Sequence, residues 1–250
     1  MAHTELQIET ADGHCPTHAY RPSGSGPWPA VIMYMDGIGL RPALMEIAER
    51  IANNGYYVLL PNLFYRVAFD ARHGMRVFTD PDLRKHLVTR VMPSASAANV
   101  MRDTETLFAH LAAQREVEDV PIGVTGYCMG GRLAVYAAGY FGDRIVAAAS
   151  YHGGGLATDA PDSPHRLAPH MTARVYVAGA TKDPNFDDAQ KARLEQALTE
   201  ADVDHTIETY NAMHGFVPRD TPVHDEAATA RHWETLLALF AAELKAGPPQ

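Results

Sequence analysis

The 250-residue sequence has few of the features that mark disulfide-rich, membrane-spanning or nucleic-acid-binding proteins. Its two cysteines, Cys15 and Cys128, are too few for a disulfide framework, so we expect free thiols. No apolar run approaches the roughly 18 residues that indicate a membrane span. The chain has 21 Lys and Arg against 30 Asp and Glu, and its net charge of -9 argues against nucleic acid or an anionic membrane as a partner.

Residues 1–5 lack the basic and apolar blocks of a secretory signal, and we therefore expect a cytoplasmic protein. The sequence has 13 histidines but no His-Glu-x-x-His motif, and His14 and His18 stand on one predicted strand without supporting ligands. We accordingly expect neither a metal nor another cofactor. A hydrophobic content of 46% is ordinary for a globular protein, and a monomer is the expected state.

Short apolar segments alternate with helix-length segments along the chain. Such alternation predicts an α/β fold with a mostly parallel central sheet of about seven or eight strands, flanked by helices on both faces. The predicted strands are 6–10, 17–20, 30–35, 56–60, 121–125, 145–151, 173–178 and 205–210, and the predicted helices are 42–54, 94–114, 133–142, 187–200 and 222–245.

No linker interrupts the pattern, so residues 1–250 are predicted to form a single domain. Residues 62–93 carry scattered basic and aromatic side chains, which predict short helices forming either a cap or an irregular insertion. Residues 246–250 (Ala-Gly-Pro-Pro-Gln) are expected to form a frayed tail.

The most informative segment is 126–131 (Gly-Tyr-Cys-Met-Gly-Gly), which lies where a strand turns sharply into a helix. It matches the nucleophile elbow G-x-S-x-G with Cys128 in the serine position. The glycines let strand and helix approach closely, and the N-terminal end of the helix favours a thiolate. A cysteine at a glycine-rich turn is more often a small buried residue, so this prediction depends on further catalytic groups.

Two such groups follow later strands. Asp183 comes after the strand that ends near residue 178, and His214 comes after the strand that ends near residue 210. Because sites gather at the carboxyl ends of parallel strands, we expect both residues to meet Cys128. The order nucleophile, acid, histidine is that of the α/β-hydrolase fold. Asp187 and Asp188 are alternatives for the acid, although either could instead cap the helix that follows.

Acyl transfer also requires donors for an oxyanion. The backbone N–H of Met129 is one candidate, and Gly37, in the loop after the strand ending at residue 35, is the other, with Ile38 as its alternative. The carboxylate of Asp36 beside this loop would oppose developing negative charge. It could instead accept a hydrogen bond from the neutral thiol of the empty site.

With these residues assembled, the chain resembles the dienelactone hydrolase family, or carboxymethylenebutenolidases, of the α/β-hydrolase fold. The resemblance rests on segment 126–131, the acid segment around Asp183, and His214-Gly-Phe, with Asp36 as a fourth feature, and it covers about residues 5–245. It implies a hydrolase of lactones in which an acidic residue holds the thiol until substrate displaces it. Asp36 stands at that acid position, where the type enzyme has Glu.

The resemblance also implies arginines that bind a substrate carboxylate, and Arg219 lies close to one such position. His152 ends another predicted strand, where it could line the pocket or form a turn. We therefore expect a cysteine-dependent hydrolase of lactones or small carboxylic esters that acts through an acyl-thioester. A small-molecule binding or sensor protein on the same fold is the alternative, and a redox-active Cys128 is a third hypothesis.

Overall fold

The computed structural model describes residues 1–244, apart from the side chains of Arg72 and His73, and the predicted tail at 246–250 lies outside the described residues. Within that range, eight strands form one sheet in the order β1-β2-β4-β3-β5-β6-β7-β8. The β1-β2 and β2-β4 pairs are antiparallel, and the other pairs are parallel. The strands are β1 (Ala2–Thr10), β2 (Gly13–Arg21), β3 (Ala30–Tyr34), β4 (Tyr57–Pro61), β5 (Ile122–Tyr127), β6 (Ile145–Tyr151), β7 (Arg174–Ala180) and β8 (His205–Tyr210).

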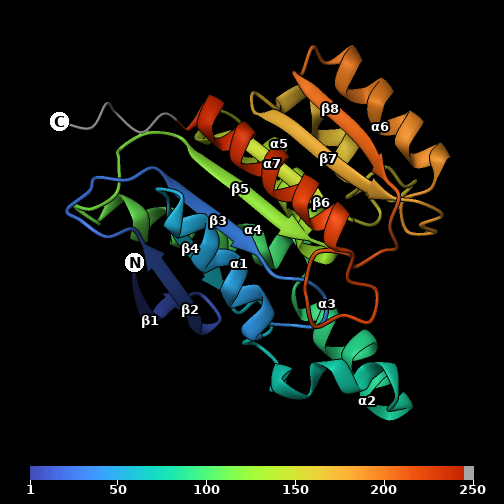
Figure 1. Cartoon of the computed structure of the whole chain (residues 1–250), viewed down its shortest axis with the longest axis horizontal. Helices are drawn as coiled ribbons and strands as arrows, with labels where there is room; N and C mark the ends of the chain where they lie inside the picture. The colour runs from blue at the N-terminus through green and yellow to red at the C-terminus, as the bar shows by residue number, and fades with distance from the viewer. Residues whose placement is uncertain (245–250) are drawn as a thin grey trace.

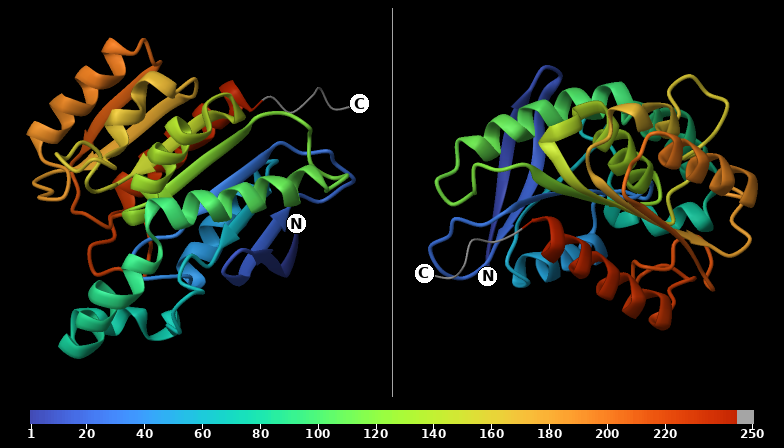
Figure 2. Two further views of the ribbon diagram at one scale, coloured as in Figure 1. Left: turned by 180° about the vertical axis from the view of Figure 1, so that it is seen from behind. Right: turned by 90° about the horizontal axis from the view of Figure 1, so that it is seen from above.

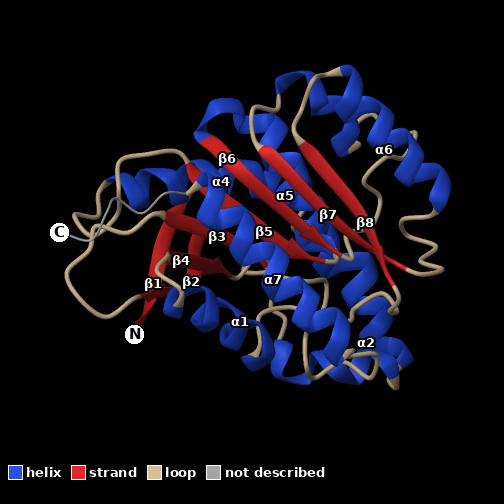
Figure 3. Cartoon of the chain, turned by 45° about the horizontal axis from the view of Figure 1, so that its top comes forward, coloured by secondary structure: helices blue, strands red, loops and turns tan. Residues whose placement is uncertain are grey.

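Helices cover both faces of this sheet, as predicted (Figures 1 and 2). Helices α1 (Pro42–Asn53) and α7 (Glu226–Glu243) lie on one face, and α4 (Ala97–Ala112), α5 (Met129–Phe141) and α6 (Asp188–Glu200) lie on the other. Figure 3 shows the sheet as a twisted layer between the two groups of helices. Short turns of 3-10 helix, η3 (Gly142–Arg144) and η4 (Pro164–His170), flank β6. The predicted α/β fold class is confirmed.

The central strands are buried because both of their faces are covered. Every residue of β3, β4 and β5 is buried, which explains their continuous apolar sequences. Side-chain caps set several helix starts: Ser96 accepts from the amide of Asn99 at α4, and Asp225 accepts from the amide of Ala228 at α7. The cap at Asp225 explains why α7 begins at Glu226 and not at the predicted residue 222.

The turn from β5 into α5 is possible only with glycine at two positions. A Cβ added to Gly126 would lie 2.1 Å from the carbonyl oxygen of Gly130. A Cβ on Gly130 would lie 2.2 Å from the carbonyl oxygen of Tyr34 in β3. Backbone atoms cannot yield at such distances, so the small residues of the elbow are required by packing.

Residues 62–93 form a chain of short helices beyond the carboxyl ends of the central strands (Figure 1). These are η1 (Ala71–Phe78), α2 (Pro81–His86), η2 (Leu87–Val91) and α3 (Met92–Ser94). The segment packs on the loop that follows β3. A Cβ on Gly74 would meet the Ile38 side chain at 2.6 Å, and a Cβ on Gly37 would meet Met92 Cε at 3.2 Å.

No helix among the described residues is both long and apolar enough to cross a membrane.

Candidate active site

Three residues that are far apart in sequence meet at the carboxyl ends of three strands. Cys128 follows β5, Asp183 follows β7 and His214 follows β8. His214 Nε2 lies 3.0 Å from Cys128 Sγ, and His214 Nδ1 lies 2.6 Å from Asp183 Oδ2. The imidazole therefore links the thiol to the carboxylate in one chain of hydrogen bonds.

The backbone is strained at the same end of the sheet. Cys128 has φ 54 and ψ -114, His152 after β6 has φ 42, and Lys182 after β7 has φ 57. Non-glycine residues in such conformations cost about 1–3 kcal/mol each and concentrate at functional sites. This strained backbone places Cys128 at the N-cap of α5, where the positive end of the helix dipole favours a negative charge.

Asp183, and not its sequence neighbours, reaches the imidazole. Its side chain is buried, and Oδ1 accepts a hydrogen bond from the amide of Asn185 at 2.9 Å. Asp187 caps α6 by accepting from the amide of Gln190, and Asp188 is fully exposed beside Lys191. Capping accounts for Asp187, and exposure at the first turn of α6 accounts for Asp188, so neither alternative lies in the site.

The hydrogen bonds favour the charged forms of His214 and Asp183. Burial alone would lower the pKa of His214, but hydrogen bonds to Asp183 and Cys128 outweigh it and raise this pKa to about 10. Burial would raise the pKa of Asp183, yet the hydrogen bond from His214 holds it below its usual value. At neutral pH His214 is therefore an imidazolium, and Asp183 accepts the proton on its Nδ1.

We predict that the imidazole of His214 titrates near pH 10, and that its pKa falls in Asp183→Asn because the anionic partner is lost. Histidine proton resonances followed by NMR from pH 5 to pH 11 would measure both values. A titration of His214 near 6.5 in the wild-type protein would contradict the prediction.

The same shift makes stability depend on pH. Because the pKa of His214 is higher in the folded protein than in the unfolded chain, its contribution is complete below about pH 6.5 and is lost as the pH rises through about 10. Asp183 behaves oppositely, since its depressed pKa gives stability that is lost in acid. We expect the free energy of unfolding in urea to fall less between pH 6.5 and pH 10 in His214→Gln than in wild type.

Two backbone amides lie on segments that contact each other, one of them directly after Cys128. A Cβ built on Gly37 would be 4.0 Å from the Cβ of Met129, so the loop after β3 and the start of α5 are in contact. The N–H of Ile38 donates to Asp36 Oδ1 at 2.9 Å. Within residues 1–244, the amides of Gly37 and Met129 have no acceptor. Gly37, and not Ile38, is therefore the amide of this loop that is free for a ligand.

The hydrogen bonds of Asp36 differ from the predicted contact with the Cys128 thiol. Its Oδ1 accepts from the amides of Ile38 and Gly39 and from Arg41 Nη1, the last at 2.7 Å. The hydrogen-bond partner of the Cys128 thiol among the described residues is His214, and not Asp36. A short aspartate side chain folds back onto the amides of its own loop, which explains the difference.

Arg41 holds this loop to the loop that carries His214. The guanidinium is only 2% exposed, and it donates from Nε and Nη2 to Asp220 at 2.7 and 3.1 Å. Burial opposes its charge, but Asp36 and Asp220 raise the pKa of Arg41 above its usual value. We call Asp36, Arg41 and Asp220 the buried ion triad after its two buried members, Asp36 and Arg41, while Asp220 is exposed. It fixes the free amide of Gly37 relative to the imidazole.

Two predicted substrate-binding residues do not lie where we expected them. Arg219 is exposed, with 70% of its side chain accessible, and pairs with Glu46 on α1. The ring of His152 is fully buried, 5.3 Å from the ring of His214 and 4.9 Å from that of Phe216. Burial and the neighbouring histidines lower the pKa of His152, so it is a neutral packing residue with no surface for substrate.

Sequence reasoning missed Arg41 and Met92, which shape the site. Arg41 precedes the proline that starts α1, and its spacing of five from Asp36 was the only available signal. Met92 lies in a segment without helical periodicity, and only packing brings it to Gly37.

The chain is similar to known proteins and to solved structures over nearly its whole length. The profile described as "Dienelactone hydrolase family" matches residues 15–244. Carboxymethylenebutenolidase of Rhodococcus opacus is 26% identical over 257 residues, which cover 98% of this chain and 94% of that protein. A crystal structure from Klebsiella pneumoniae, provisionally named a dienelactone hydrolase, is 26% identical with a TM-score of 0.82, covering 96% of this chain and 98% of that one. A dienelactone hydrolase-like promiscuous phosphotriesterase from metagenomic libraries, 24% identical with a TM-score of 0.74 over 97% of this chain and 99% of that one, shares the fold.

Proposed function

The chain belongs to the dienelactone hydrolase family, and from this premise we propose that it hydrolyses lactones or small carboxylic esters through an acyl-thioester on Cys128. Homology to carboxymethylenebutenolidase makes it a hydrolase of this family. The observation that carries the cysteine mechanism is the chain of contacts from Cys128 Sγ through His214 to Asp183, at 3.0 and 2.6 Å. The thiol and the imidazole are already within the reach needed for proton transfer.

Acylation needs a nucleophile, donors for an oxyanion and a proton donor for the leaving group. The Cys128 thiolate attacks the carbonyl carbon, and the new carbon–sulfur bond pushes an electron pair onto the carbonyl oxygen. The free amides of Gly37 and Met129 stabilise that oxyanion, because their segments are in contact at the start of α5 and neither amide has an acceptor among the described residues. The ester carbon–oxygen bond then breaks, and His214 Nε2 gives its proton to the departing alkoxide.

Deacylation reverses the proton transfer. The neutral His214 accepts a proton from water, which attacks the thioester carbon. Collapse of the second oxyanion breaks the carbon–sulfur bond and restores the thiolate beside the imidazolium. Asp183 keeps the proton on Nδ1 throughout, which leaves Nε2 free to exchange protons with sulfur, leaving group and water.

The buried ion triad determines the role that we propose for Asp36. Asp36 is engaged by Arg41 and by its own loop, so we propose that it positions the amide of Gly37 and does not hold the thiol. A fixed amide at this position matters, because oxyanion stabilisation depends on donors that need no rearrangement during the reaction.

The test is detection of both turnover and the covalent intermediate. Purified protein should hydrolyse p-nitrophenyl acetate and δ-valerolactone, and acid quenching during turnover should leave one acetyl group on the peptide that contains Cys128, seen by mass spectrometry. Hydrolysis without any acylated cysteine would contradict the thioester mechanism. Binding without turnover would favour the sensor alternative, although a binding protein has no use for the strained backbone at Cys128.

A further inference from the structure

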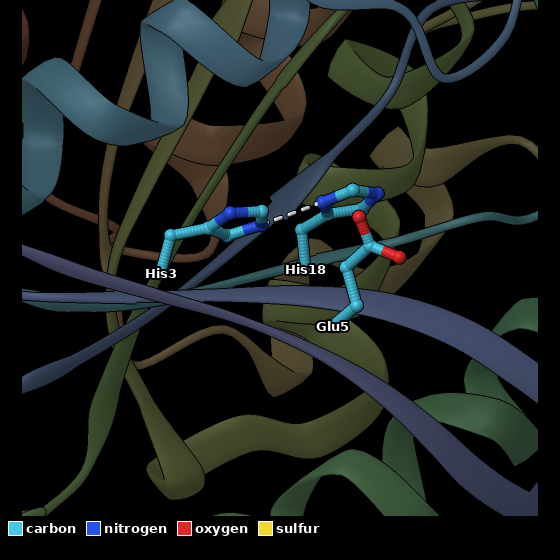
Figure 4. A group of neighbouring side chains, drawn as sticks. All are labelled: His3, Glu5 and His18. Carbon is cyan, nitrogen blue, oxygen red and sulfur yellow. Dashed lines mark hydrogen bonds between the residues drawn. The ribbon is translucent and has the colours of Figure 1, made fainter.

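Three metal-ligand side chains converge at the edge of the sheet, far from Cys128 along the strand order. His3 and Glu5 lie on β1, and His18 lies on β2 directly opposite Glu5 in the antiparallel register. His3 Nε2 and His18 Nδ1 are 2.8 Å apart, and one ring nitrogen of each histidine and one carboxylate oxygen of Glu5 all lie within 4.8 Å of one another. Figure 4 shows the two rings meeting edge to edge with the Glu5 carboxylate next to His18.

Strand geometry dictates this convergence. Residues two apart on a strand point to the same face, so His3 and Glu5 share one face of β1. Directly opposed residues of an antiparallel pair have neighbouring Cβ atoms, which brings His18 to the same place. The cluster is not evident in the sequence, because 12 residues of hairpin and strand lie between Glu5 and His18 along the chain.

The ligand atoms are held in place before any ion arrives. The ring of His18 is buried, and the ring of His3 stacks on Tyr20 with centroids 4.5 Å apart. The planes of the two imidazoles differ by 1°. Each ring thus loses little freedom when its nitrogen coordinates an ion.

The three groups have few competing partners. Among the described residues, Glu5 takes part in no ion pair and no side-chain hydrogen bond, and the imidazoles of His3 and His18 bond only to each other. One facing nitrogen must carry the proton of that bond. If this proton moves to the other nitrogen of its own ring, both facing nitrogens present lone pairs, with no net change in charge.

We propose that His3 Nε2, His18 Nδ1 and the Glu5 carboxylate bind a divalent transition-metal ion of the Zn²⁺ type. Imidazole and carboxylate ligands suit this ion, with the fourth tetrahedral position open to water. Nitrogens about 2.0 Å from a tetrahedral ion lie about 3.3 Å apart, so the two nitrogens need to separate by only about 0.5 Å. The rings must also turn until both lone pairs point at the ion. The ion fastens edge strand β1 to β2.

This site is structural and independent of the proposed hydrolase. Strands β2, β4 and β3 separate β1 from β5, which carries Cys128. An ion at the cluster binds only the folded hairpin, since the unfolded chain does not hold the three ligands together. It therefore raises the melting temperature by mass action without taking part in ester hydrolysis.

The experiment measures Zn²⁺ binding by isothermal titration calorimetry to tag-free Cys128→Ala protein. This background is required because the thiol and imidazole of the active site would themselves bind Zn²⁺. We expect one ion per chain and a rise in melting temperature. His3→Gln, Glu5→Gln and His18→Gln should each weaken binding at least about tenfold. His14→Gln, an exposed histidine of the same β2 strand, is the matched control and should leave the affinity unchanged.

Full affinity in any one of the three ligand variants would overturn the proposal, as would the absence of binding in Cys128→Ala protein. His3 and Glu5 are exposed, so their variants should fold even if replacement of the buried His18 disturbs the hairpin. Circular dichroism of each variant distinguishes loss of the ligand from loss of structure. Failure of this test leaves the ester-hydrolysis proposal unaffected, because that proposal is tested on Cys128.

Discussion

Replacing Cys128 with alanine is expected to lower kcat for p-nitrophenyl acetate by about a thousandfold or more, because no other described group takes its place next to His214. The side chain is partly exposed at the end of β5, and its removal leaves the hydrogen bond between His214 and Asp183 intact. The fold should therefore survive. Steady-state rates with wild-type and Cys128→Ala protein, together with acyl-enzyme detection, provide the measurement.

The chain supplies its own matched control, since it has one other cysteine. Cys15 is buried in β2 and contacts the backbone of Pro16 and Asn62, away from the triad. Burial raises the pKa of Cys15 to about 11, so it is an unreactive thiol at neutral pH. Cys15→Ala should keep near-wild-type turnover and should still acquire the acetyl group on Cys128. Equal activity of Cys128→Ala and Cys15→Ala would exclude the proposed nucleophile.

Replacing Arg41 with methionine is expected to have the largest effect on stability among single changes around the site. The substitution leaves Asp36 buried without a counter-charge, which costs about 3–5 kcal/mol in comparable cases. It also frees the loop that positions the amide of Gly37, so kcat should fall more than KM rises. Urea denaturation and steady-state kinetics at one pH measure the two effects.

Arg219→Met is the matched control, because Arg219 belongs to the same loop as Asp220 but is exposed and pairs with Glu46 at the surface. Exposed ion pairs contribute about 0–1 kcal/mol, so this variant should unfold like wild type. The double variant Asp36→Asn/Arg41→Met should regain part of the lost stability, since it no longer buries an unpaired charge. Equal destabilisation by Arg41→Met and Arg219→Met would refute the role of the buried ion triad.

The secondary structure of the sheet could be predicted because each central strand has a continuous apolar sequence bounded by turn residues. Strands β3, β4 and β5 lie within a residue or two of their predicted bounds. The predicted helix bounds were less accurate. The proline at residue 222 favoured a helix start there, but α7 begins after its actual cap, Asp225. Residues 62–93 could not be arranged from sequence, since their short helices are defined by contacts with the loop after β3.

The positions of the thiol, the carboxyl group and the imidazole after parallel strands could be read from local features of the chain, namely the alternation of strands with helices and the glycines of the elbow. Which charges are buried together depends on the packing of distant segments. Asp36 faces Arg41 and not the thiol, Arg219 faces Glu46, and His3 meets His18 across a hairpin. Side-chain partners depend on which surfaces pack and lose water, and no local pattern of residues records that choice.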